Sequence, residues 1–239
     1  MSKKGLQKRG MERRQKMLSA AIELFLEQGY EKTSTTQIAK AAGMSQTSFF
    51  AAFENKEALL LELVKLMFEN QFSGAARMME QVHTPVLLYA IETSLQLYIT
   101  ELSETLRELY VMAYTLSSTS EYVYRNTAQK LQYIFQSYLP DQKEADFYEM
   151  DIASSNIMRG FMAKRCDLYF TIEKKVRRYL NCCLRMYCVP KQQIAEVIAV
   201  VETMDLEQKA KDLIAQVVKQ AKAEMSDTED LAGEGEFDE

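Results

Sequence analysis

The sequence predicts an all-α protein in which a small N-terminal three-helix domain precedes a larger helical domain. Its 239 residues include only 8 glycines and 3 prolines, and few stretches alternate apolar with polar residues. Apolar residues instead recur at the three- and four-residue spacing of helices buried on one side. Between residues 33 and 61, a glycine also separates two short helical patterns, and a longer helical pattern follows them.

The first helix is expected over about residues 13–28. Its apolar residues lie at helical spacing and include Met17, Ala21 and Phe25. Gly29 is expected to end the helix in the left-handed conformation, which glycine adopts without steric cost, and Tyr30 to fold back onto it.

The next two helices form the most informative part of the chain. Ser34 or Thr35 can cap the first of them, and Gly43 supplies the positive φ that a sharp turn requires. Ser45 then caps the second helix, whose Phe49 is expected to be buried. This leaves three polar side chains at the start of the second helix: Gln46, Thr47 and Ser48. The arrangement indicates a helix-turn-helix, which places its second helix in the DNA major groove, rather than a simple helical hairpin.

The whole segment MLSAAIELFLEQGYEKTSTTQIAKAAGMSQTSFFAAFENKEALLLELV closely resembles the DNA-binding domain of the TetR family of bacterial repressors. The resemblance covers about residues 15–64 and includes the Gly-Tyr helix exit, the Ala-Gly-Met-Ser turn and the closing Phe-x-x-Lys-Glu-x-Leu. It implies a homodimer that binds a double-stranded DNA operator and responds to a small-molecule effector, most often as a repressor. The rest of the chain matches no motif of the family.

The resemblance also implies which residues contact DNA. The expected DNA-binding residues are Thr35, Thr36, Gln46, Thr47, Ser48, Phe50 and Lys56. Phe50 stands where the family commonly has a tyrosine that contacts a phosphate, so that hydrogen bond is missing. Ala51 and Ala52 can at most touch thymine methyl groups, which leaves base recognition to the polar start of the helix.

Asn55 is a suitable N-cap for a fourth helix, but Lys56 places a cation at the positive end of the helix dipole. We therefore interpret Lys56 as a phosphate contact. Together with Thr35 and Thr36, it would set the register of the protein on DNA rather than read its sequence.

Charge is divided unevenly along the chain. The formal net charge is −5 overall, whereas residues 1–56 carry +5 and the remainder −10. A flexible basic arm is expected over residues 1–14, where it would follow phosphates or enter the minor groove. A solvated leader without a DNA role is the alternative.

The predicted domains are the basic arm at 1–14, the helix-turn-helix domain at 15–56, a helical effector-binding and dimerisation domain at 57–224, and an acidic disordered tail at 225–239. Helices in the large domain are expected at about 55–79, 85–116 with a possible break near Ser103, 121–138, 141–165 capped by Asp141, 171–187, 190–204 and 205–224.

The large domain is rich in methionine and aromatic residues, which favours a small apolar or aromatic effector over a strongly charged one. The candidate pocket residues are Met67, Phe68, Phe72, Tyr98, Tyr110, Tyr114 and Tyr133. Ordinary core packing explains the same helical spacing.

The expected helices at 141–165 and 171–187 are candidates for the dimer interface, because family members pair two late helices from each subunit. The candidate interface residues share one face of the first helix and are Ala153, Ile157, Gly160, Phe161 and Lys164. Packing within the subunit is the alternative.

Other functional classes find little support. The four cysteines have no paired CxxC spacing, and neither a metal site, a cofactor motif nor a catalytic triad is evident. No apolar run is long enough for a membrane span or a signal peptide, so a cytoplasmic protein that is not an enzyme is expected. The expected function is a ligand-responsive transcriptional regulator, most often a repressor. The alternative is a helical interaction protein that has lost sequence-specific DNA binding.

Overall fold

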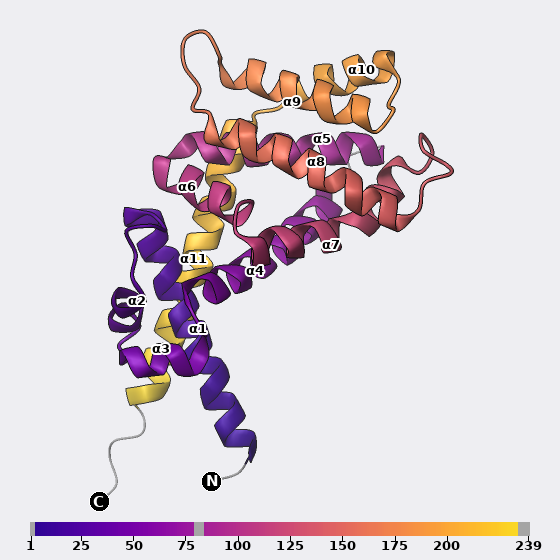
Figure 1. Cartoon of the computed structure of the whole chain (residues 1–239). Helices are drawn as coiled ribbons and strands as arrows, with labels where there is room; N and C mark the ends of the chain where they lie inside the picture. Colours follow the sequence, from indigo (N-terminus) through magenta and orange to yellow (C-terminus); the bar gives the residue numbers. More distant parts are fainter. Residues whose placement is uncertain (1–2, 79–83, 234–239) are drawn as a thin grey trace, which may run out of the picture. The chain divides into compact units, whose positions relative to one another are not determined.

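The computed structural model describes residues 3–78 and 84–233, with side chains described for residue 8 and for 10–67 and 84–219. The described residues form eleven α-helices and contain no strand, which confirms the all-α prediction (Figure 1). The chain divides into two compact units: unit 1 comprises Met1–Leu63 and Asp212–Glu239, and unit 2 comprises Val64–Lys211. Within the described residues, no helix combines the length and apolar character that a membrane span requires.

Unit 1 contains the three-helix domain, formed by α1 (Lys3–Gln28), α2 (Thr35–Ala41), α3 (Gln46–Ala52) and the first two turns of α4 (Lys56–Met78). Helices α1, α2 and α3 all contact one another. Their shared core includes Phe25, Ile38 and Phe49, each with 0% of its surface exposed. Burying a side chain of this size contributes roughly 1.5–3 kcal/mol, so the core is a main source of stability for the domain.

The turns of unit 1 follow the sequence prediction closely. Gly29 and Gly43 have φ angles of 91° and 67°, in the region that favours glycine. Ser34 caps α2 in a capping box, in which its hydroxyl accepts from Gln37 N (3.2 Å) while Gln37 Oε1 accepts from Ser34 N (2.8 Å). Ser45 caps α3 by accepting from the amide of Ser48 (3.2 Å). These local signals therefore determine the helix-turn-helix.

The flexible arm expected over residues 1–14 is not what the structure contains, because α1 is helical from Lys3. The residues that extend it are mostly Lys, Arg, Gln, Glu and Met, which have good helix propensity, and none is proline. Lys8 and Glu12 also form an ion pair across one helical turn (3.9 Å). The basic residues therefore lie on a helix that is continuous with the three-helix domain.

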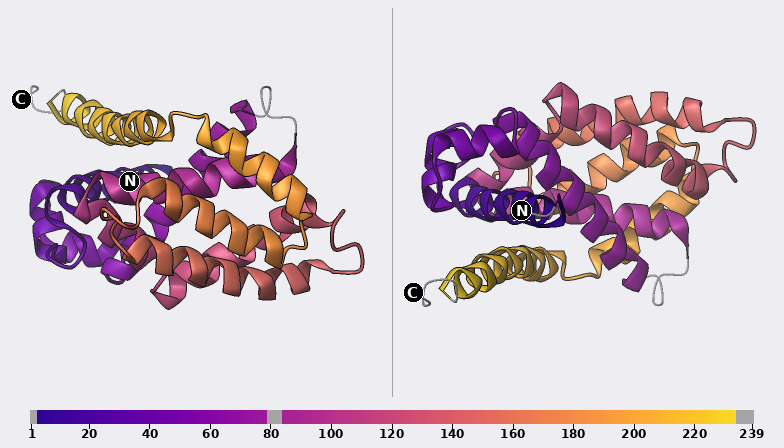
Figure 2. Two further views of the ribbon diagram at one scale, coloured as in Figure 1. Left: turned by 90° about the horizontal axis from the view of Figure 1, so that it is seen from above. Right: turned by 90° about the horizontal axis from the view of Figure 1, so that it is seen from below.

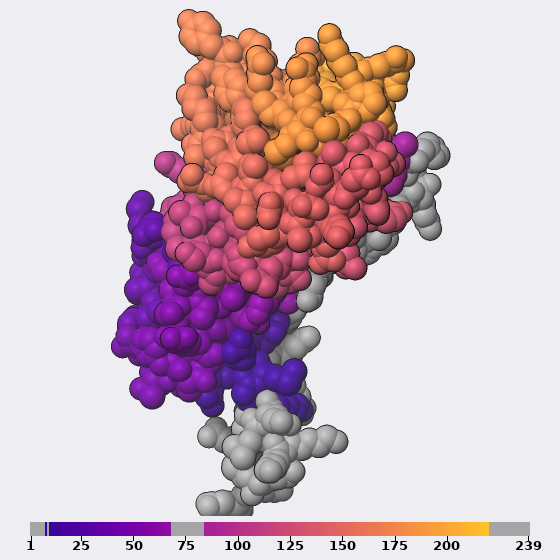
Figure 3. Space-filling model, turned by 45° about the vertical axis from the view of Figure 1, so that its right-hand side comes forward, coloured from indigo at the N-terminus to yellow at the C-terminus, as the bar shows by residue number. Residues whose placement is uncertain are grey.

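Unit 2 is built from α5 (Pro85–Leu102), α6 (Glu104–Ala113), α7 (Ser117–Phe135), α8 (Glu144–Ala163), α9 (Ile172–Met186) and α10 (Lys191–Glu202), with parts of α4 and α11 (Leu206–Gly233). Helix α5 is central, since it packs against all of α6 to α10. Helix α9 contacts α8 on one side and α10 on the other, as the views of Figure 2 show. Figure 3 shows α9 and α10, in orange, side by side on the surface of this unit.

Several predicted helix ends in unit 2 are confirmed. The expected break at Ser103 separates α5 from α6, and the Ser103 hydroxyl caps α6 by accepting from Leu106 N (3.1 Å). Thr171 caps α9, and Asp205 accepts from Gln208 N (3.0 Å) at the start of α11. The cap expected at Asp141 is wrong, because α8 begins only at Glu144.

The C-terminal segment also differs from the expectation of a disordered tail over residues 225–239. Helix α11 continues to Gly233, and residues 234–239 lie outside the described part of the chain. Residues 226–233 contain no proline, and their first glycine is Gly233, so the helix meets no residue that would end it earlier.

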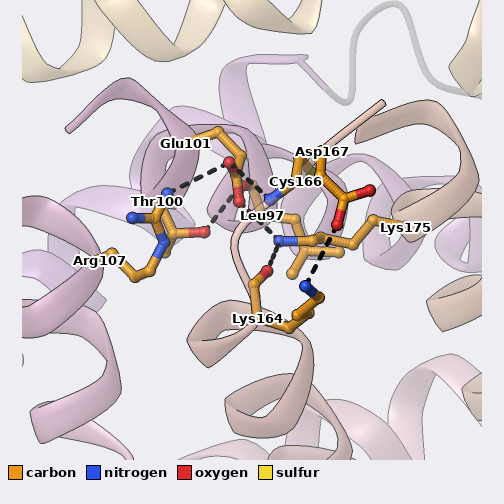
Figure 4. Close-up of polar contacts among 8 residues, drawn as sticks. All are labelled: Leu97, Thr100, Glu101, Arg107, Lys164, Cys166, Asp167 and Lys175. Carbon is orange, nitrogen blue, oxygen red and sulfur yellow. Dashed lines mark hydrogen bonds and ion pairs between the residues drawn. The ribbon is translucent and has the colours of Figure 1, made fainter. Parts of the chain in front are cut away.

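A buried ion pair anchors the segment between α8 and α9 (Figure 4). The Lys175 ammonium is 0% exposed and donates to Glu101 Oε1 (2.6 Å) and to the carbonyl of Lys164. Glu101 Oε2 accepts from Arg107 (3.2 Å) and from the amide of Cys166 (3.2 Å). Burial alone would raise the pKa of Glu101, but the hydrogen bonds from Lys175 and Cys166 and the two nearby cations lower it overall. The network therefore joins the end of α5 to the start of α9.

Candidate functional site

The second helix of the helix-turn-helix presents one continuous face to solvent. Gln46, Thr47, Phe50 and Ala51 are exposed, whereas Phe49 is fully buried. Their spacing of one, three and one residues places the four exposed side chains on a single side of α3. Phe50 is 53% exposed, whereas phenylalanine side chains are usually buried. This face is the candidate base-reading surface.

Ser48 lies less favourably for DNA than Gln46 and Thr47. It is half-buried, and its hydroxyl forms a hydrogen bond with that of Ser45 (3.0 Å). Of the three residues expected to read bases, the structure therefore exposes only Gln46 and Thr47 fully. At the start of α2, Thr36 is exposed and Thr35 is half-exposed, as phosphate contacts require.

Lys56 has protein partners that sequence analysis did not anticipate. Its ammonium donates to the carbonyls of Tyr30 (2.8 Å) and Thr33 (2.9 Å) and lies 4.1 Å from the centre of the Tyr30 ring. The loop between α1 and α2 therefore supplies the hydrogen-bond acceptors for this cation. Its unfavourable position at the positive end of the α4 dipole does not indicate a phosphate contact. The buried surroundings and the carboxylates of Glu57 and Glu31 raise the pKa of Tyr30 to about 12.

Arg14, which was expected to belong to the flexible arm, instead supports the end of α3. Its guanidinium lies 4.4 Å from the centre of the Phe53 ring and donates to the carbonyl of Ala52 (2.5 Å). It also pairs with Glu62 of α4 at 3.5 Å. A cation suits the C-terminal end of a helix, where unpaired carbonyls concentrate negative charge. Arg14 thus holds the C-terminal end of α3, the candidate recognition helix, in place.

A further basic residue faces solvent near the candidate site. Lys40, in the last turn of α2, is exposed, and sequence analysis did not single it out. The signal was present in the sequence, since Lys40 lies one helical turn beyond Thr36 and on the same side of α2. Lys40 therefore joins Thr36 as a candidate phosphate contact.

Unit 2 contains a cavity between its helices, with a volume of about 60 Å³. Helices α5, α7 and α8 supply most of its walls, and α9 adds one tyrosine. The lining residues are Tyr89, Glu92, Thr93, Gln96, Tyr114, Val123, Thr127, Lys130, Leu131, Ile134, Asp151, Ser154, Ser155, Met158 and Tyr179. The lining is mainly apolar, as the effector prediction assumed, but it also contains two acids and one lysine, which that prediction did not include.

The charged groups of this cavity are held in a poorly solvated environment. Asp151 is 3% exposed, and burial raises the pKa of its carboxyl to about 6, although Ser154 and Ser155 donate to Oδ1 at 2.7 and 3.1 Å. Burial likewise raises the pKa of Glu92 to about 7, with Lys130 opposing the shift. Burial lowers the pKa of Lys130 to about 8, and Glu92 opposes it in turn.

The structure does not gather the predicted pocket residues around one cavity. Tyr114 lines the cavity, but Tyr110 is buried elsewhere, Tyr98 is half-buried outside the lining, and Tyr133 is 70% exposed. Met67 is half-exposed, and the side chains of Phe68 and Phe72 lie outside the described residues. Aromatic content alone was a poor guide, because the tyrosines of unit 2 are spread over its core and its surface.

The comparison with known families bears on the helix-turn-helix. The sequence model of a family described as "Bacterial regulatory proteins, tetR family" matches residues 17–63, the segment that forms most of the three-helix domain. Over these residues, the chain is similar to the TetR family.

Several regulators resemble the chain, mostly over its N-terminal part. It is 30% identical over 78 residues to an uncharacterized HTH-type transcriptional regulator, YuxN of Bacillus subtilis, covering 33% of this chain and 27% of that protein. It is 39% identical over 66 residues to the HTH-type transcriptional regulator TcmR of Streptomyces glaucescens, covering 27% of this chain and 29% of that protein. These alignments therefore span less than a third of either relative.

A longer similarity reaches into unit 2. The chain is 28% identical over 134 residues to the biofilm operon icaADBC HTH-type negative transcriptional regulator IcaR of Staphylococcus aureus. That alignment covers 56% of this chain and 68% of the relative. All three relatives are named as regulators of transcription and none as an enzyme.

The residues expected at the dimer interface differ in exposure. Ala153, Gly160 and Lys164 are exposed, and a methyl group added at Gly160 would meet no atom within 4 Å. Ile157 and Phe161 are half-buried, and Phe161 packs against Tyr179 with ring centres 6.2 Å apart. The outward face of α8 thus carries small residues with open space beside them.

Proposed function

We propose that this protein is a DNA-binding transcriptional regulator whose α3 reads bases in the major groove of an operator. The observation that carries this proposal is the exposed face of α3, where Gln46 and Thr47 stand clear of the protein on a helix capped at one end and supported by Arg14 at the other. Glutamine can pair with the N6 and N7 atoms of adenine, and threonine can contact a base or a thymine methyl group.

The charge of the chain supports the same proposal. Residues 1–56 carry a net +5 in an otherwise acidic protein, so phosphates are attracted to this end of the molecule. Thr36 and Lys40 lie along α2 where they can contact the DNA backbone, which would position α3. We keep Thr35 as a further backbone contact, and Phe50 as an apolar contact to a thymine methyl group.

We further propose that the protein represses transcription as a homodimer and leaves its operator when a small molecule binds unit 2. Repression is suggested by the name of the Staphylococcus relative, a negative regulator. The exposed small residues Ala153 and Gly160 on α8 would allow a second copy to approach closely. Helix α4 offers a covalent link for the response, because the boundary between the units falls within it.

Footprinting of the purified protein on the DNA upstream of its own gene tests this function. A protected pseudo-palindrome with half-sites about one helical turn apart is expected. Gln46→Ala should abolish protection at that site, whereas Glu149→Gln, an exposed change on α8, should leave it intact. Equal, sequence-independent binding by the wild type and Gln46→Ala proteins would contradict the proposal.

One observation favours a second candidate, a helical protein that binds another protein through α3. Phe50 and Ala51 form an exposed apolar strip along this helix, which a protein partner could cover as readily as a thymine methyl group. The same footprinting experiment distinguishes the two, since an interaction protein would leave all DNA positions unprotected.

A further inference from the structure

The hydroxyl groups that line the cavity in unit 2 present hydrogen-bond acceptors to a ligand, and the N–H donors of its side chains are those of Gln96 and Lys130. The hydroxyls of Thr93 and Thr127 donate to the carbonyls of Tyr89 (2.7 Å) and Val123 (2.6 Å). Those of Ser154 and Ser155 both donate to Asp151 Oδ1. Because each hydroxyl has a single proton, these four groups can only accept hydrogen bonds from a molecule in the cavity.

Two of the three tyrosine hydroxyl protons in the lining are also committed to protein acceptors. The Tyr114 hydroxyl donates to Gln96 Oε1 (2.9 Å). The hydroxyls of Tyr89 and Tyr179 lie 3.1 Å apart, so that one of their two protons joins them. A ligand would therefore meet oxygen lone pairs and aromatic ring faces, both of which favour a cation that carries N–H groups.

Two carboxylate oxygens at the cavity have no hydrogen-bond partner among the residues that the structure describes. One is Oδ2 of Asp151, whose side chain is 97% buried, and the other is Oε1 of Glu92. Thr127 is close enough to Asp151 to favour its charged form, but its proton is committed to Val123. A buried charged acceptor without a donor is costly, and native proteins rarely leave one without an ion, a water molecule or a ligand.

The charge balance of the lining also points to a cation. When both carboxyls are ionised, Asp151 and Glu92 carry two negative charges and Lys130 carries one positive charge, which leaves one negative charge to be matched. An anionic ligand would be repelled by two carboxylates, whereas a monovalent cation would neutralise the site. Burial makes this preference stronger than it would be at the protein surface.

From these contacts we propose that the cavity binds a small primary ammonium ion, whose N–H groups donate to Asp151 Oδ2 while its carbon atoms lie against the tyrosine rings and Glu92 adds negative charge to the lining. One water molecule needs roughly 10–15 Å³ of cavity volume, so a cavity of about 60 Å³ holds a ligand of about four to six non-hydrogen atoms. The inference concerns binding to unit 2. That the amine acts as the effector rests on the proposed function.

Isothermal titration calorimetry of the full-length protein with propylammonium chloride tests the inference. Saturable one-to-one binding is expected. Propanol and propionate, which match the probe in size, should bind at least about tenfold more weakly, because each loses an ammonium-to-carboxylate hydrogen bond. Tetramethylammonium keeps the charge but has no N–H donor, and it should also bind at least about tenfold more weakly. Tighter binding of propionate, or equal binding of all four probes, would overturn the inference.

Variants locate the site. Asp151→Asn should weaken propylammonium binding by at least about tenfold, and Glu92→Gln should weaken it as well. Glu149→Gln removes a charge from the exposed face of the same helix as Asp151 and should leave binding unchanged. Lys130→Met removes the lysine of the lining and should not weaken propylammonium binding. If the cavity bound an anion instead, this variant would weaken the binding of that anion. Wild-type affinity in Asp151→Asn would overturn the inference.

Two further measurements keep the result interpretable. Thermal unfolding shows whether each variant is folded, and Asp151→Asn is expected to melt no lower than the wild type because it removes a buried, partly unpaired charge. Repeating the DNA footprint with propylammonium tests the link to regulation. Binding without any change in the footprint would support the cavity assignment and contradict only the effector role, whereas loss of the footprint in every condition would contradict only the proposed function.

Discussion

Replacing Lys56 with methionine should destabilise unit 1 rather than remove a DNA contact. The variant keeps the apolar stem of the side chain but loses two ammonium-to-carbonyl hydrogen bonds, to Tyr30 (2.8 Å) and Thr33 (2.9 Å), and the contact with the Tyr30 ring. Hydrogen bonds to charged groups are worth about 1.5–3 kcal/mol each. Water can reach the half-buried carbonyls after the change, so we expect a net loss of about 2–3 kcal/mol.

Urea denaturation of the full-length protein measures this loss, and hydrogen exchange locates it. The amides of residues 29–34 should exchange faster in Lys56→Met, because the loop between α1 and α2 loses its anchor. Lys40→Met provides a matched control, since it removes the same charge from an exposed position in the same domain. Lys40→Met should leave the free energy of unfolding within about 0.5 kcal/mol of the wild-type value.

Salt dependence separates the structural role from a phosphate contact. Losing one phosphate contact reduces the slope of log affinity against log salt by about 0.9. We expect that change for Lys40→Met and not for Lys56→Met under conditions in which both proteins are folded. Wild-type stability of Lys56→Met together with a reduced salt slope would refute our account of this lysine.

Three other outcomes follow from named contacts. Changing Thr47 to alanine should alter the preference among operator variants by roughly 1–3 kcal/mol while leaving the salt slope unchanged, as competition binding assays would show. The raised pKa of Asp151, about 6, means that the folded protein holds a proton that the unfolded chain releases near pH 4, so stability should fall as the pH rises from about 4 to 6. The urea midpoint should change less with pH over this range in Asp151→Asn than in the wild type. The same dependence on pH in both proteins would contradict a raised pKa at Asp151. Lys175→Met should cost about 3–5 kcal/mol in urea unfolding because it leaves Glu101 without its buried partner, and adding Glu101→Gln should recover part of that loss.

The helix-turn-helix could be predicted from the sequence because its signals are local. Gly43 and the capping serines act within a few residues of their own positions, so the local amino-acid sequence determines the turn and the helix starts. The exposed face of α3 follows from the same spacing. The roles of Lys56 and Arg14 could not be predicted in this way, because their carbonyl partners lie 23 to 38 residues away along the chain.

The cavity was missed for a different physical reason. Methionine and tyrosine content does not distinguish a pocket from a core, and most of the tyrosines proposed for the pocket lie elsewhere. The useful signal was an acid on an apolar face: Asp151 lies one helical turn after Phe147 and shares its face with Met158, both of which are buried. A carboxylate at such a position must find a partner, and it marks a polar site more reliably than aromatic composition does.

The anchored segment between α8 and α9 has a mechanical consequence. Leu168 and Tyr169 are 92% and 87% exposed at its tip, yet the backbone that carries them is held on both sides. Asp167 Oδ1 accepts from the amides of Tyr169 and Phe170 (2.9 Å each), while Lys175 binds the carbonyl of Lys164. Any molecule that covers this apolar tip therefore meets a loop whose conformational entropy was already lost on folding. Association there would cost less free energy than at a mobile loop of the same composition.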